Sequence, residues 1–147
     1  MTPAEHHMLA LGIRWLHVAA MSVAFGGAFL VAWLSYRTSP HHLIETAARY
    51  EQAFWAAAGV LVMTGVGNLG AFGENLFEPG TAWGTTFTAK LWLVAALIAI
   101  SLPRSLIVAL LAASERRPQL VDLRPMYTVT TGIFAVIVAL AIVLAHQ

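Results

Sequence analysis

Cysteine is absent from this chain of 147 residues. Disulfides, thiolate metal sites and c-type haem attachment all require cysteine, so the sequence excludes each of them. Charge is scarce as well, because Asp, Glu, Lys and Arg together make up 10% of the residues. A nucleotide-binding or nucleic-acid-binding module needs polar loops for which this chain has no room, and we expect no nucleic-acid partner.

Long segments without charge dominate the rest of the sequence. Residues 15–36, 52–73 and 125–147 contain no Asp, Glu, Lys or Arg, and residues 91–113 contain only Arg104. A hydrocarbon core of about 30 Å is crossed by roughly 20 helical residues, so each segment is long enough to span it. We therefore predict an all-α integral membrane protein, a four-helix antiparallel transmembrane bundle that forms one transmembrane domain over residues 1–147.

The predicted helices run over about residues 8–36, 45–70, 85–114 and 125–146, and the charges between them predict the orientation. The loop between the second and third helices carries Glu74 and Glu78. The other two loops and their flanks carry five arginines: Arg37, Arg49, Arg116, Arg117 and Arg124. By the positive-inside rule the arginine-bearing loops face the cytoplasm. We expect a multi-pass protein of the cell inner membrane with both termini outside.

His17 is the histidine that lies clearly inside the predicted bundle, in the outer half of the first helix. An ionisable side chain within a membrane is costly and usually faces a cavity or a partner, so His17 is a candidate site residue. One interpretation is a neutral imidazole that is hydrogen-bonded to a Thr or Asn of a neighbouring helix. The other is a ligand to a metal ion or to a haem iron.

Two methionines extend the metal interpretation. Met21 follows His17 by one helical turn, and Met63 lies in the outer half of the second helix. A thioether is a soft ligand that suits Cu(I), so His17, Met21 and Met63 together predict a cuprous site. Methionine also fills bundle cores, and each methionine taken alone is explained better by packing.

Polar residues near the same level indicate a second kind of site. Arg14 precedes His17 by one turn, Lys90 lies at the outer end of the third helix, and Asn68 lies near the end of the second. The two cations either extend to the membrane interface or hold haem propionates or an anionic substrate. Cofactor binding would then involve His17, Arg14, Lys90 and Asn68. The sequence predicts no catalytic residue.

Arg104 differs from these cations because it lies deep in the inner half of the third helix. It either extends toward the cytoplasm or pairs with Glu45 or Glu51. We expect no carboxylate deep enough for a proton relay, because Glu51 is predicted near the start of the second helix.

Short motifs in the first three predicted helices resemble those of a known family. Leu16-His17-Val18-Ala19-Ala20 is followed by Phe25-Gly26-Gly27, then Thr64-Gly65-x-x-Asn68, Thr81-x-Trp83-Gly84, Lys90-Leu91 and Arg104. Their order and spacing resemble the membrane domain of the copper resistance D (CopD) family, although Phe25 stands where that family often has Trp. The resemblance implies a role in copper uptake or copper tolerance.

A more distant resemblance is to HemJ-type protoporphyrinogen oxidases, which are four-helix membrane proteins associated with b-type haem. Those proteins share a first-helix histidine and a third-helix lysine, to which His17 and Lys90 correspond. The resemblances imply copper or, alternatively, haem b as the bound group.

We expect a protein that handles copper, by binding or transporting it in the outer half of the bundle. The alternatives are a b-type haem protein for electron transfer or porphyrinogen oxidation, and a structural subunit of a larger membrane complex. The expected partners are the lipid bilayer, a periplasmic copper protein or an electron-transfer partner, and further copies of the chain.

Overall fold

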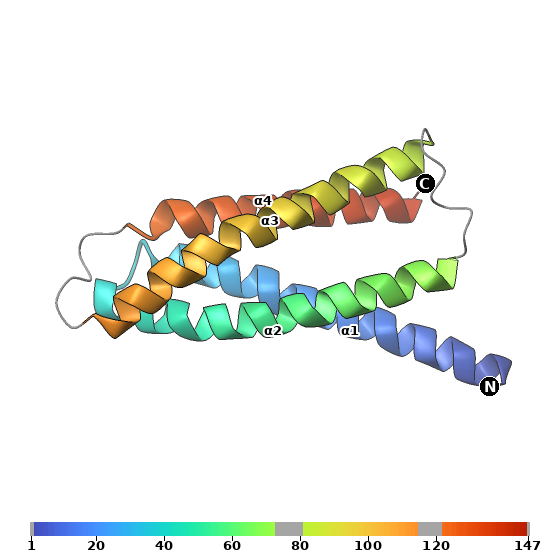
Figure 1. Cartoon of the computed structure of the whole chain (residues 1–147), viewed down its shortest axis with the longest axis horizontal. Coiled ribbons are helices and arrows are strands. Elements are labelled where there is room, and N and C mark those ends of the chain that lie inside the picture. The colour runs from blue at the N-terminus through green and yellow to red at the C-terminus, as the bar shows by residue number, and fades with distance from the viewer. Residues whose placement is uncertain (1, 73–80, 115–121, 147) are drawn as a thin grey trace.

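A computed structural model describes residues 2–72, 81–114 and 122–146, apart from the side chains of residue 3 and residues 67–72. It contains four long helices, α1 (Pro3–Leu34), α2 (Pro40–Phe72), α3 (Ala82–Ala113) and α4 (Arg124–His146), shown in Figure 1. The described residues form no strand. Three of the helices, α1, α3 and α4, are long and apolar enough to cross a membrane. The prediction of an all-α membrane bundle of four helices is confirmed.

Local sequence explains where α1 and α3 begin. Thr2 accepts a hydrogen bond from the Glu5 amide, and the Glu5 carboxylate accepts one from the Thr2 amide, which together form a capping box before α1. Thr81 caps α3 by accepting a hydrogen bond from the Gly84 amide at 3.0 Å. These caps satisfy amide groups that have no partner within the helix.

The start of α2 differs from the expectation in a way that matters for the interior. The helix begins at Pro40 rather than near residue 45, and proline is favoured at a first helical position. Glu51 therefore lies three turns into α2 and is buried. The expectation that Glu51 stands near a helix start is wrong.

The four helices pack as neighbours in a ring, because α1 contacts α2 and α4, and α3 contacts α4 and α2. Figure 1 shows that the helices converge where residues 35–39 and the start of α4 lie, and that α1 and α2 diverge from α3 and α4 toward the other end. Following the predicted orientation, we call the converging half the inner half. The half that contains the starts of α1 and α3 is the outer half.

Aromatic side chains fill the core of the inner half. The Tyr50 ring lies 6.0 Å from the Phe54 ring and 5.8 Å from the Tyr127 ring, and Phe54 also contacts Phe134. Gly27 allows Tyr50 to approach α1 closely, because a Cβ at Gly27 would lie 2.5 and 2.6 Å from two carbons of the Tyr50 ring. The Tyr50 hydroxyl then donates to the Ala24 carbonyl at 2.9 Å.

Candidate functional site

The outer half brings His17 of α1 against Thr64 of α2. His17 is half-buried, and its Nδ1 lies 2.8 Å from the Thr64 Oγ1. The imidazole also lies over Gly65, where an added Cβ would be 3.8 Å from the His17 Cε1. A small residue at 65 thus leaves room for the ring against α2.

The hydrogen bonds of Thr64 determine which nitrogen of His17 carries the proton. The Thr64 hydroxyl has one proton, and it donates that proton to the Val60 carbonyl at 2.6 Å. Its oxygen can then only accept from His17, so the proton of the neutral imidazole is on Nδ1. The lone pair of the ring is therefore on Nε2, the atom that would bind a metal.

Lys90 of α3 is the third polar group of the outer half. Its side chain is half-buried, and its ammonium group lies close enough to act electrostatically on the His17 ring. Arg14, one turn before His17, has an exposed side chain. The side chain of Asn68 lies outside the described residues.

The two methionines occupy different surroundings. Met21 is partly buried and packs against the hydrophobic core one turn after His17. Met63 is 77% exposed, because it precedes Thr64 and the Thr64 side chain takes the position that faces His17. Within the part of the chain that the structure describes, no group of three or more His, Cys, Asp or Glu side chains is placed to hold a metal ion.

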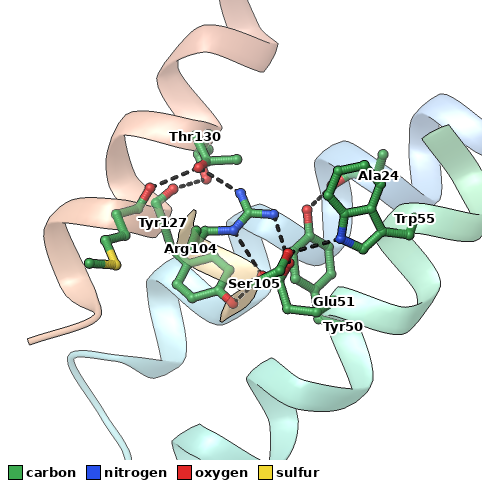
Figure 2. A network of polar contacts seen from close by, with 10 residues as sticks. Ala24, Tyr50, Glu51, Trp55, Arg104, Ser105, Tyr127 and Thr130 are labelled. Atoms are coloured by element: carbon green, nitrogen blue, oxygen red, sulfur yellow. Dashed lines mark hydrogen bonds and ion pairs between the residues drawn. The ribbon is translucent and has the colours of Figure 1, made fainter. Parts of the chain in front are cut away.

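The inner half holds a network of buried polar groups that centres on an ion pair (Figure 2). Arg104 donates from Nε to the Glu51 Oε1 at 2.8 Å and from Nη2 to Oε2 at 3.1 Å. The Tyr127 hydroxyl donates to Oε1 at 2.6 Å, and the Ser105 hydroxyl donates to Oε2. Each oxygen of Glu51 thus has two donors, which are the surroundings of an ionised carboxylate.

Arg104 is enclosed even more completely than its partner, with only 1% of its side chain exposed. Its Nη1 donates to the Thr130 hydroxyl at 2.8 Å, and its guanidinium lies over three aromatic rings at 4.8 to 5.7 Å from their centroids, those of Phe54, Tyr127 and Tyr50. Cation–π contacts of this kind stabilise a charge that has no water around it. Together with the Tyr50 bond to Ala24, the network connects all four helices.

These contacts decide between the two interpretations of Arg104, extension toward the cytoplasm or pairing with a glutamate. Arg104 pairs with Glu51, whereas Glu45 forms an exposed pair with Arg49 on the surface of α2. The sequence reasoning did not identify Tyr127 and Thr130 as partners. Their spacing of three residues near the start of α4, at the depth of Arg104, is the signal that was available.

These observations define a multi-pass helical membrane protein. Its inner half is joined by a network of buried hydrogen bonds, and its outer half holds an imidazole between two helices. A model of the family described as Copper resistance protein D matches residues 44–144, well over half of the chain. The chain belongs to the copper resistance protein D family, as its motifs indicated. Comparisons with curated proteins and with solved structures each found no match.

The matched residues lie in three of the four helices. They cover most of α2 and α4 and all of α3, and so include Glu51, Arg104 and Tyr127. They omit α1, although we expected the resemblance to extend over the first three helices. His17 lies outside the match, so its assignment depends on its own geometry.

Proposed function

We propose that this protein binds copper in the outer half of its bundle, with the Nε2 of His17 as the principal ligand atom. The observation that carries the proposal is the hydrogen bond from His17 to Thr64, which fixes the ring against α2 and leaves the Nε2 lone pair for a metal. Membership of the copper resistance protein D family supports copper as the ion.

The chemistry of the donors favours Cu(I). His17 supplies a neutral nitrogen, and Met21, one turn further along α1, supplies a soft sulfur. Lys90 lies near enough to repel a metal ion, and Coulomb repulsion is twice as large for a divalent as for a monovalent cation. Copper is the ion that this site would carry. Met63 can act as a further ligand only if its exposed side chain turns toward α1.

Binding in the outer half is favoured over passage through the inner half. A copper ion that moved along the bundle would meet the buried pair of Arg104 and Glu51, where each carboxylate oxygen already accepts two hydrogen bonds and is not free to bind a metal. We therefore propose that the chain accepts or delivers copper on its outer side, with a periplasmic copper protein as the exchange partner.

The same proposal includes the orientation, with both termini outside the cytoplasmic membrane of the cell. Because the chain has no cysteine, one introduced thiol reports one position. A cysteine in place of Ala82 should react with an impermeant maleimide in intact cells, and a cysteine in place of Ser39 should react only after lysis. The opposite labelling would contradict the orientation.

Metal analysis and an optical spectrum test the copper assignment. The purified protein, loaded with Cu(I) and dialysed, should retain copper and show no Soret band. His17→Ala should lose the copper, while His7→Ala, at an exposed position in the first turns of α1, should keep it. A Soret band that disappears in His17→Ala would show that the bound group is haem and not copper. Retention of copper by His17→Ala would show that His17 is not the ligand.

A further inference from the structure

A stripe of large side chains runs along the lipid-facing surface of α1 toward its inner end. Phe29, Trp33 and Tyr36 follow one another at spacings of four and three residues, and each is at least half exposed. Phe29 and Trp33 lie one turn apart on α1, and Tyr36 follows in the turn after the helix ends at Leu34, where its amide donates to the Trp33 carbonyl, so the three rings follow one another toward the inner end. Aromatic residues at the end of a spanning helix are typical of the level of the lipid headgroups.

Two arginines lie over the last two rings of this stripe. The Arg37 guanidinium carbon is 5.7 Å from the centroid of the Trp33 ring, and the Arg124 guanidinium carbon is 5.3 Å from that of Tyr36. Arg124 reaches α1 from the start of α4, where its Nε also donates to the Ser35 carbonyl at 3.0 Å. These contacts place both guanidinium groups beside the inner end of α1.

Asp122 is the acidic group that pairs with Arg124. The Asp122 carboxylate accepts a hydrogen bond from the Arg124 amide at 3.0 Å, and it is 3.8 Å from the Arg124 Nε, beyond hydrogen-bonding distance. Arg49, at the same end of the bundle, is paired more closely, because its Nη2 lies 2.7 Å from the Glu45 carboxylate. Arg124 and Arg49 thus each have an acidic partner, at a longer distance for Arg124, whereas Arg37 forms no ion pair among the described residues.

We propose that Arg37 and Arg124 bind the phosphate of an anionic phospholipid, whose acyl chain lies along the stripe of Phe29, Trp33 and Tyr36. Guanidinium groups match the geometry of phosphate oxygens, and basic pockets at the cytoplasmic side of membrane helices bind anionic headgroups. The apolar stripe that leads directly to the two charges favours a lipid over free phosphate, because only a lipid contacts both. This site is independent of the copper site.

Native mass spectrometry of the protein from nanodiscs tests the proposal with a matched pair of variants. With phosphatidylglycerol, the unaltered protein should retain a lipid that phosphatidylcholine does not replace. Arg37→Gln should lower that retention roughly tenfold, because a charge-assisted hydrogen bond is lost. Arg49→Gln removes the same charge from the exposed surface of α2 at the same end of the bundle, and it should have an effect of less than about twofold.

Three results would overturn the assignment. Equal losses in Arg37→Gln and Arg49→Gln would show that only the overall charge of the inner end attracts the lipid. Equal retention of phosphatidylcholine would show that the headgroup charge is not recognised. Inorganic phosphate that displaces the lipid at an equal concentration would show that the acyl chain contributes nothing.

Discussion

The inner and outer halves of this bundle use polar residues in opposite ways. In the inner half, Glu51 and Arg104 are buried, and each hydrogen-bonds to groups on other helices. In the outer half, His17 and Lys90 are half-buried, and Nε2 of His17 keeps a lone pair. The difference teaches that buried polar groups join the helices of a membrane bundle where they bond to one another; at His17, where one acceptor is left over, we propose a ligand site.

The two halves are also far enough apart to be altered separately. Glu51 and Thr64 are thirteen residues apart on α2, which corresponds to about 20 Å along a helix. Substitutions separated by more than about 10 Å usually have additive effects. Changes to the inner network should therefore affect stability, and changes around His17 should affect copper.

The largest expected effect is the loss of the buried ion pair. Glu51→Gln keeps the shape of the side chain but leaves the Arg104 cation without its counter-ion, and the free energy of unfolding should fall by about 3–5 kcal/mol. Thermal or denaturant unfolding in detergent measures the change. Glu45→Gln, which breaks the exposed pair with Arg49, is the matched control and should cost no more than about 0.5 kcal/mol. Similar costs for both variants would refute the structural role of the network.

The next largest difference in the free energy of unfolding is expected between alanine substitutions at two neighbouring glycines, Gly26 and Gly27. Gly27→Ala places a methyl group against the Tyr50 ring, which has the Arg104 guanidinium on it, and should destabilise the protein by about 1–3 kcal/mol. Gly26→Ala meets no atom within 4 Å, and it should be neutral or stabilise the helix by up to about 1 kcal/mol. Unfolding of the two variants under one condition compares them, and equal stabilities would show that Tyr50 is not held against α1.

A smaller effect is expected from the partner of His17. Thr64→Val keeps the volume of the side chain and removes the oxygen that accepts from Nδ1, so the ring loses its fixed orientation. Loss of such a partner typically weakens metal binding about 10- to 100-fold, and we expect a Cu(I) affinity at the lower end of that range. A competition titration with a Cu(I) chelator measures it. Thr131→Val, in α4, is the control and should leave the affinity unchanged.

The sequence predicted the number of helices, because segments without charge that are long enough to cross a membrane can be read from the sequence directly. It also predicted that Arg104 either extends toward the cytoplasm or pairs with a carboxylate, because a buried cation without a partner is costly. It gave a Thr or Asn of a neighbouring helix as one possible partner of His17, and the structure shows Thr64 in that place, but the sequence did not predict that Met63 turns away. Adjacent residues on a helix point in directions about 100° apart, and packing against α1 decides which one turns inward. Tyr127 and Thr130 were missed for the same reason, since their role depends on how α4 is rotated against α3.

The most direct test of this division compares two variants by two measurements, Cu(I) retained after dialysis and the midpoint of thermal unfolding. His17→Ala should lose the copper and keep a midpoint close to that of the unaltered apoprotein. Glu51→Gln should have a much lower midpoint and, below that temperature, should still bind copper. Loss of copper in Glu51→Gln while it remains folded, or its full retention in His17→Ala, would contradict the account.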